Sequence, residues 1–264
     1  MLPDVNTLAG KRILVTRAAE QFEAVARLIE QRGGVPLPFP CLAVQCLPDN
    51  IRDALRDLPA GTSIIMSSTN GVHCAAQALG EDFIPLFSRH QVIVVGPHTA
   101  DALCGHGIQA AWVADETSQD GLIQGFMEHG LPASICFLRA EEGRDVLQDA
   151  LRQQDVEVRL VHAYRTVCPE DNPIAVLCAL RQGEVDAVLL GSSRTAQHYL
   201  RRIGDTQLAD RPAVAVISPQ VAAAAETEGL SVQAVAKQAS FAAMLDALAE
   251  YFTVSRSAVE EHRP

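Results

Sequence analysis

Long apolar segments are absent from this sequence of 264 residues. No apolar run approaches the roughly 20 residues that a membrane-spanning helix needs. The first residues, MLPDVNTLAGKR, also lack the apolar core of a secretion signal. These two absences predict a cytoplasmic protein that has no membrane partner.

Motifs that bind phosphate or metal are missing as well. The chain contains no GxGxxG, GxxxxGK[ST], GxSxG or HExxH pattern. Its 7 cysteines include no CxxC pair, and neither they nor the 8 histidines have the spacing of metal ligands. We therefore expect buried, reduced thiols and no metal. A nucleotide-dependent enzyme is a disfavoured alternative.

Positive charge is in short supply. The 21 Lys and Arg residues are outnumbered by 32 Asp and Glu residues, which gives a formal net charge of −11. Such a surface repels the phosphate backbone, so nucleic acid is not an expected partner. It also repels small polyanions at long range, so an anionic ligand would have to be held by local hydrogen-bond donors.

What the chain does contain is a long internal repeat. Residues 94–102 (VVGPHTADA) return 122 positions later as residues 216–224 (VISPQVAAA), and residues 13–17 align with 135–139 at the same shift. Residues 64–68 align with 188–192 at a shift of 124. A period this long is not that of a solenoid, so it predicts two similar domains with a ligand-binding cleft between them.

Short apolar runs alternate with amphipathic stretches, which predicts an α/β fold with parallel sheets. The expected strands are residues 12–16, 63–66, 91–95, 110–113, 135–138, 186–190, 213–217 and 231–235. The expected helices are residues 21–32, 70–79, 97–104, 119–128, 144–153, 194–202, 220–228 and 241–252. Two extended segments, 35–47 and 157–168, break the pattern and are interpreted as crossings between the domains. The polar tail after Thr253 is expected to be frayed.

Small polar residues follow the predicted strands and open the next helices. In parallel sheets, ligands bind at the carboxyl ends of strands, and helix N-termini favour carboxylates. The predicted ligand-binding residues are Arg17, Ser68, Thr69, Asn70, Gly96, His98, Thr99, Arg139, Gly191, Ser192, Ser193, Ser218 and Gln220. The alternative is helix capping for each loop and surface ion pairing for each arginine, including Arg165 and Arg194.

Tyr164 is the candidate catalytic residue. It lies in the second crossing segment, and a phenol can donate a hydrogen bond or a proton without adding negative charge beside an anionic ligand. The alternative is a tyrosine that only packs on the neighbouring strand. His162, two residues earlier, is expected to be structural.

The order of these motifs resembles one known family. The chain is similar to the uroporphyrinogen-III synthase (HemD-like) family in the segments ILVTR (13–17), SSTNGV (67–72), VVGPHTA (94–100), VHAYRTV (161–167), LLGSSRTA (189–196) and Ser218-Pro219. The resemblance implies two flavodoxin-like parallel α/β domains joined by a two-stranded β-ladder. It assigns residues 1–35 and 169–264 to one domain, 48–156 to the other, and 36–47 and 157–168 to the linker strands.

The resemblance also implies a reaction. Members of the family cyclise hydroxymethylbilane to uroporphyrinogen III, with loss of water and inversion of the last pyrrole ring through a spiro intermediate. The chain would then be a monomeric, cyclising hydro-lyase without a cofactor, supplied by transient hand-over from hydroxymethylbilane synthase. Tyr164 matches the family's tyrosine, which is suggested to assist departure of the hydroxyl. A non-catalytic two-domain sensor of a small anion is the alternative function.

Overall fold

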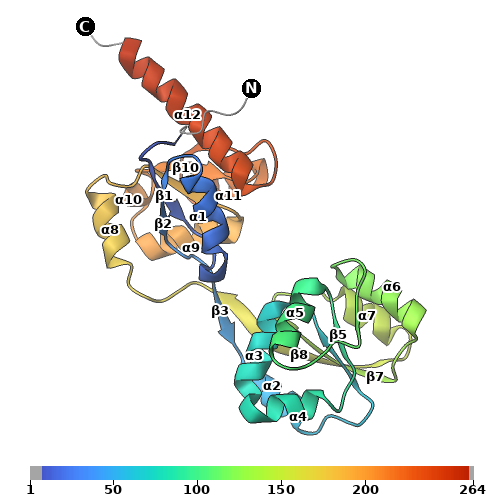
Figure 1. The fold of residues 1–264 in the computed structure, drawn as a ribbon. Helices are drawn as coiled ribbons and strands as arrows, with labels where there is room; N and C mark the ends of the chain where they lie inside the picture. Colours follow the sequence, from blue (N-terminus) through green and yellow to red (C-terminus); the bar gives the residue numbers. More distant parts are fainter. Residues whose placement is uncertain (1–7, 262–264) are drawn as a thin grey trace. The chain divides into compact units, whose positions relative to one another are not determined.

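The computed structural model describes residues 8–261, which fold into two α/β units (Figure 1). The first unit combines both ends of the chain, up to residue 43 and from residue 168 onward. The second unit is the continuous stretch 44–167. Each unit has its own sheet and its own hydrophobic core, so the α/β class with two parallel-sheet domains is confirmed.

The sheet of the first unit has five parallel strands in the order β2-β1-β9-β10-β11. The strands are β1 (Arg12–Val15), β2 (Val35–Pro38), β9 (Ala187–Leu190), β10 (Ala213–Val216) and β11 (Val232–Val235). Numbered within the unit, this order is 2-1-3-4-5, which is the flavodoxin-like arrangement. β9 and, after Arg12, β1 are apolar, as expected for strands with both faces covered.

Helices cover both faces of this sheet (Figure 1). They are α1 (Phe22–Glu30), α8 (Ile174–Arg181), α9 (Ser193–Ile203), α10 (Thr206–Ala209), α11 (Pro219–Thr227) and α12 (Phe241–Glu261), with a short 3-10 turn at Ala19–Gln21. Successive side chains of β1 point to opposite faces. Leu14 joins the core under α8, α9 and α11, while Ile13 and Val15 join the core under α1 and α12.

The sheet of the second unit has the order β3-β8-β7-β4-β5-β6. Its strands are β3 (Ala43–Cys46), β4 (Ser63–Met66), β5 (Val92–Val94), β6 (Trp112–Val113), β7 (Ser134–Ala140) and β8 (Glu157–Val167). The repeat aligns β7 with β1, β4 with β9 and β5 with β10. When each strand is replaced by its repeat partner, the order β8-β7-β4-β5-β6 corresponds to the order β2-β1-β9-β10-β11 of the first unit. The repeated segments therefore occupy equivalent places in two similar sheets.

The second unit also has helices on both faces of its sheet. They are α2 (Pro48–Arg56), α3 (Thr69–Leu79), α4 (Phe83–Phe87), α5 (Pro97–Gly105), α6 (Gln119–His129) and α7 (Val146–Arg152), with a 3-10 turn at Gly80–Asp82. Ile64 and Met66 of β4 pack under α2, α3 and α5, and Ile65 packs under α6 and α7 on the other face.

The predicted crossing segments have a different arrangement in the structure. Residues 35–38 form β2 inside the sheet of the first unit. The whole of β8 is a strand of the second unit, paired in parallel with β7 from Glu157 to Tyr164. The second unit spans residues 44–167, where 48–156 was the predicted domain, and its sheet includes β3 and β8. Helix α12 continues to Glu261, whereas the tail after Thr253 was expected to be frayed.

The cysteines also differ from expectation. Cys46 and Cys74 form a disulfide, although the sequence predicted mostly buried thiols. Cys104 and Cys178 are exposed thiols, and Cys41, Cys136 and Cys168 are the buried ones. Cys46 and Cys74 are 28 positions apart and share no local motif, so only the fold brings them together. Burial raises the pKa of the Cys136 thiol to about 12, which keeps it protonated.

Gly121 near the start of α6 allows a prediction about packing. A Cβ atom there would lie 2.2 Å from the backbone oxygen of Glu116, so Gly121→Ala requires the preceding loop to move. We expect it to lower the free energy of unfolding by about 1–3 kcal/mol. Gly105→Ala is the matched control, because a Cβ at the end of α5 meets nothing within 4 Å. Urea unfolding of the two variants should show opposite or clearly unequal shifts, and equal midpoints would contradict the steric argument.

Candidate functional site

The predicted binding residues of the first unit lie at the carboxyl edge of its sheet. Arg17 follows β1, residues 191–193 follow β9, and residues 218–220 follow β10. β9 lies between β1 and β10, so the three loops are neighbours on one sheet edge. Two of them open helices, α9 and α11, whose first N–H groups point out of the helix at this edge.

Several side chains in these loops already have partners. The Ser192 hydroxyl accepts from the Thr195 N–H at 3.1 Å, and the Ser218 hydroxyl accepts from the Val221 N–H at 3.4 Å. The Arg17 guanidinium donates to Gln21 Oε1 and lies over the Phe241 ring, 4.9 Å from its centroid. Both serines therefore serve as helix caps.

Two further positions shape this edge. Gly191 leaves room for Phe241, because a Cβ there would lie 2.9 Å from the ring. Gln220, by contrast, is exposed in the first turn of α11. Ser193 is half-buried at the first position of α9. What remains available for a ligand at this edge is mainly backbone N–H groups, the exposed Gln220 and Ser193.

The second unit has an equivalent set of loops on strands β8-β7-β4-β5, which are adjacent in that order. Ser68, Thr69 and Asn70 follow β4 and begin α3, and residues 96–99 follow β5 and begin α5. Arg139 and Tyr164 lie near the ends of β7 and β8. The fold therefore brings together residues that are up to 96 positions apart in the sequence.

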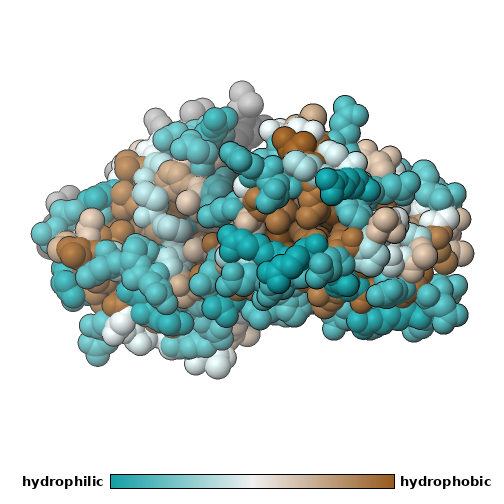
Figure 2. Space-filling view, turned by 90° about the horizontal axis from the view of Figure 1, so that it is seen from below, coloured by the Kyte–Doolittle hydropathy of each residue, from teal (hydrophilic) through white to brown (hydrophobic). Residues whose placement is uncertain are grey.

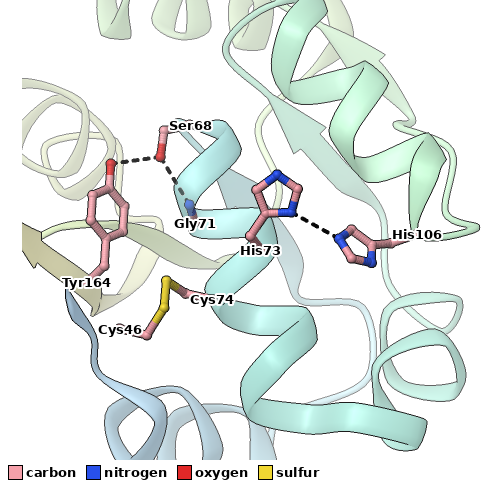
Figure 3. Close-up of a disulfide and its surroundings, with 7 residues drawn as sticks. All are labelled: Cys46, Ser68, Gly71, His73, Cys74, His106 and Tyr164. Atoms are coloured by element: carbon pink, nitrogen blue, oxygen red, sulfur yellow. Dashed lines mark hydrogen bonds between the residues drawn. A yellow bond between two sulfur atoms is a disulfide. The ribbon is translucent and has the colours of Figure 1, made fainter. Parts of the chain in front are cut away.

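Ser68 and Tyr164 form the polar centre of this set (Figure 3). Their hydroxyl oxygens are 2.8 Å apart, and the Ser68 hydroxyl also accepts from the Gly71 N–H at 3.2 Å. Ser68 is the N-cap of α3, so the helix fixes the place of its hydroxyl. Tyr164 is 8% exposed and packs in the core beside α3. The pair thus has a fixed geometry at the carboxyl edge of the sheet.

The surroundings of Tyr164 keep its phenol neutral. Burial raises the pKa of Tyr164 above its usual value of 10.0, and the hydrogen bond with Ser68 opposes this shift. The Glu142 carboxylate raises the pKa further, and a hydrogen bond with Asn70 lowers it. Glu142 was missed in the sequence, where Arg139 was the only residue of this loop to be singled out. Its carboxylate accepts from the Thr166 N–H at 2.9 Å, two residues after Tyr164.

The loop after β5 is built on close backbone contacts. A Cβ at Gly96 would lie 2.8 Å from the Thr117 side chain, so the glycine lets the two segments meet. Thr99 is 6% exposed and donates its N–H to the Gly96 oxygen at 3.1 Å. His98 is exposed in the first turn of α5. Of the predicted residues in this loop, His98 is therefore the accessible side chain, and Thr99 is buried.

Arg139 has internal partners. Its side chain is 4% exposed, and its guanidinium donates to Asp145 and to the Ala140 oxygen. Its Nε has no hydrogen-bond partner. Arg165, the other arginine nearby, donates to Gln45 Oε1 at 2.8 Å. Arg139 thus fixes the loop after β7 rather than presenting an open charge at the sheet edge.

Removal of the Asp145 carboxylate is expected to lower the free energy of unfolding more than removal of the Arg139 guanidinium does. Asp145→Ala leaves the Arg139 guanidinium buried without its counterion, and we expect a loss of about 2–3 kcal/mol of unfolding free energy. In Arg139→Met the remaining Asp145 carboxylate is 56% exposed and stays hydrated, so the loss should stay below about 1.5 kcal/mol. Chemical denaturation of both variants checks the order. A larger loss in Arg139→Met would refute the argument.

No cofactor site stands out beside these loops. Among residues 8–261, no group of three or more His, Cys, Asp or Glu side chains is placed to hold a metal ion. Over the same range, no helix combines the length and apolar character of a membrane span. On the face in Figure 2, hydrophilic residues surround smaller hydrophobic patches, in keeping with the acidic composition. The donors described above are therefore the means by which this surface could hold an anion.

Comparison with known proteins identifies one family. Residues 23–246 match a family model described as uroporphyrinogen-III synthase HemD. A uroporphyrinogen-III synthase of Synechococcus elongatus is 29% identical over 202 residues, which cover 73% of this chain and 74% of that protein. A porphyrin biosynthesis protein HemD of Ruminiclostridium josui is 25% identical over 92% of this chain and 49% of its own length. The crystal structure of a uroporphyrinogen-III synthetase from Helicobacter pylori has the same fold, with a TM-score of 0.59, 15% identity and coverage of 92% of this chain and 99% of that one.

Proposed function

We propose a reaction and a site for this chain from one premise: it belongs to the uroporphyrinogen-III synthase HemD family. The chain acts in tetrapyrrole biosynthesis as a uroporphyrinogen-III synthase. It cyclises hydroxymethylbilane to uroporphyrinogen III, with loss of water and inversion of the last pyrrole ring through a spiro intermediate, as a hydro-lyase. The observation that carries the residue assignment is the neutral Tyr164 phenol held by Ser68 at a sheet edge.

Tyr164 is suited to assist departure of the hydroxyl group. The Ser68 hydroxyl accepts the Gly71 N–H and can direct its own proton to the Tyr164 oxygen, which leaves the phenol proton for the substrate. As the carbon–oxygen bond breaks, that proton leaves with the hydroxyl as water. Ring closure then releases a proton from the substrate, which restores the phenol. The remaining task is to hold the chain so that the last ring reacts through its substituted carbon, which is a matter of positioning.

The carboxylates of the substrate must be bound on a protein with a net charge of −11. Helix N-termini supply N–H donors without bulk positive charge, and α3, α5, α9 and α11 all begin at the two sheet edges. The proposed binding residues are Arg17, Ser68, Thr69, Asn70, Gly96, His98, Thr99, Gly191, Ser192, Ser193, Ser218 and Gln220. Arg139 is left out because its guanidinium is buried against Asp145.

Hydroxymethylbilane loses its hydroxyl group even without an enzyme, so it should pass quickly from the enzyme that makes it to this one. We expect a cytoplasmic monomer that receives hydroxymethylbilane by transient hand-over from hydroxymethylbilane synthase. The anion-sensor alternative is not favoured, because the matched relatives are described as synthases and biosynthesis proteins.

An isomer assay tests the function directly. Hydroxymethylbilane is generated in situ and supplied to the purified protein, and the oxidised products are separated chromatographically into uroporphyrin I and uroporphyrin III. Predominant type III isomer is the expected result, with a reaction lacking the protein as the control. Type I alone, as formed without an enzyme, would refute the proposed activity and favour the alternative function of an anion-binding protein.

A further inference from the structure

The Cys46–Cys74 disulfide joins α3, the helix that Ser68 caps, to β3, the strand next to the one that carries Tyr164 (Figure 3). On one side, β3 is the neighbour of β8, which carries Tyr164. The Leu47 N–H donates to the Ala163 oxygen at 2.9 Å, and Arg165 Nε donates to Gln45 Oε1 at 2.8 Å. Leu47 thus lies opposite Ala163, and Gln45 lies opposite Arg165. This antiparallel register places Cys46, between them, opposite Tyr164.

On the other side, Cys74 belongs to α3, the helix that Ser68 caps. Cys74 is 1% exposed and lies about one turn beyond Asn70, whose side chain acts to lower the pKa of Tyr164. Helix α3 is therefore linked to this edge of the sheet twice, by the disulfide to β3 and by the hydrogen bond of the proposed catalytic pair to β8.

The chain between the two cysteines offers no comparably direct link. It runs through α2 and β4 before it reaches Ser68, so without the disulfide the helix is held against β3 and β8 only by packing and by the Ser68–Tyr164 hydrogen bond itself. Catalysis by a positioned proton donor is sensitive to displacements of about 1 Å. A small shift of α3 relative to β8 would lengthen the Ser68–Tyr164 hydrogen bond, because Ser68 caps α3 and Tyr164 lies on β8, the strand next to β3.

We propose that the Cys46–Cys74 disulfide is a positioning device for the Tyr164–Ser68 pair, and that its reduction by a dithiol slows turnover. This inference rests on the proposed function of Tyr164. Cys46 and Cys74 contact neither substrate nor reacting atoms in this scheme and act only through the pair.

The two sulfur atoms differ in access, which defines the reduction step. Cys46 is partly exposed and Cys74 is buried, so a dithiol thiolate attacks the Cys46 sulfur. A mixed disulfide forms with Cys46, and Cys74 leaves as a thiolate that takes up a proton. The second thiol of the dithiol then displaces Cys46. Two electrons and two protons pass to the protein, and the dithiol becomes a disulfide.

The test compares kcat and KM for type III product in the oxidised protein and after complete reduction with dithiothreitol. The redox state is followed by mass spectrometry of alkylated cysteines. We expect kcat to fall at least about threefold with KM within about twofold, because a positioning defect acts on the chemical step. In Tyr164→Phe the ratio of oxidised to reduced kcat should be close to one, since the pair is already broken.

Cysteine variants separate this disulfide from the other thiols. Cys46→Ser/Cys74→Ser should behave as the reduced protein does and should not respond to dithiothreitol. Cys104→Ser/Cys178→Ser removes the two exposed thiols and should respond as the natural sequence does. If the first double variant fails to fold, reduction of the natural sequence still decides the question.

Two results would overturn the proposal: an unchanged kcat after complete reduction, or an equal loss of kcat in Tyr164→Phe. Absence of type III product in either redox state would instead refute the proposed function. In that case amide hydrogen exchange at Gly71 still tests the positioning, because its N–H donates to Ser68 Oγ. Faster exchange after reduction is expected, and unchanged exchange overturns the inference.

Discussion

Tyr164→Phe is expected to lower kcat for uroporphyrinogen III formation by about 10- to 100-fold, with KM little changed. The substitution removes one oxygen atom and keeps the ring, so the packing of β8 against α3 is retained. Ser68 keeps its place as the N-cap of α3 but has no phenol to orient. The expected loss lies at the low end for general acid catalysis, because the substrate loses its hydroxyl unaided, only more slowly.

A second tyrosine provides the matched control for this variant. Tyr199 is a fully buried residue of the first unit, and its hydroxyl donates to the Ala209 oxygen at 2.9 Å. Tyr199→Phe should reduce stability by about 1 kcal/mol and leave kcat unchanged. Steady-state kinetics of both variants under one assay condition makes the comparison. An unchanged kcat in Tyr164→Phe would remove the phenol from the mechanism and leave the isomer assay to decide the activity.

The pH dependence follows from the same environment. Because burial raises the pKa of Tyr164 above 10.0, the neutral phenol persists through the alkaline range in which an exposed tyrosine begins to ionise. Stability should depend on pH in the same direction. The contribution of Tyr164 to the free energy of unfolding is complete below the pKa of the unfolded state and is lost as pH rises through the higher pKa of the folded state. Activity that depends on the Tyr164 proton should therefore not decline between about pH 8 and 10.

Much of the fold could be predicted because the strands and helix starts have strong local signals. The apolar runs of β1 and β9 end at small polar residues, and Ser68, Ser192 and Ser218 do cap the helices that follow. The repeat also matched strands that occupy equivalent places in the two sheets. Helices α2 and α8 were missed because they lie beside the segments interpreted as crossings.

The site was less predictable, because the tertiary fold determines which side chains meet there. Tyr164 was singled out from the sequence, but its partner Ser68 is 96 positions away. Nothing in the local sequence distinguishes the buried Arg139, held by Asp145, from the more exposed Arg17. The Cys46–Cys74 pair has no motif, since its two members come from different elements. Loop positions at strand ends are thus readable from the sequence, whereas the partners of their side chains are not.

Reduction of the Cys46–Cys74 disulfide is expected to lower the free energy of unfolding of the second unit by about 3 kcal/mol. The bond closes a loop between residues 28 positions apart, and a cross-link of this length removes substantial entropy from the unfolded chain. The loop contains α2 and β4, which supply Ile51, Leu55, Ile64 and Met66 to the core of the second unit. The disulfide stabilises the second unit through its effect on the unfolded chain, whereas its proposed effect on turnover arises in the folded protein.

Trp112 makes this loss measurable in the second unit alone. It is the single tryptophan of the chain and lies on β6, so its fluorescence reports unfolding of that unit. Urea unfolding with and without dithiothreitol should give a lower midpoint for the reduced protein, and Cys46→Ser/Cys74→Ser should show no dependence on the reductant. Equal midpoints would mean that the cross-link does not constrain the unfolded chain. Because the reduced protein should remain folded in the absence of urea, a fall in kcat under those conditions reports a displaced Tyr164–Ser68 pair rather than unfolded protein.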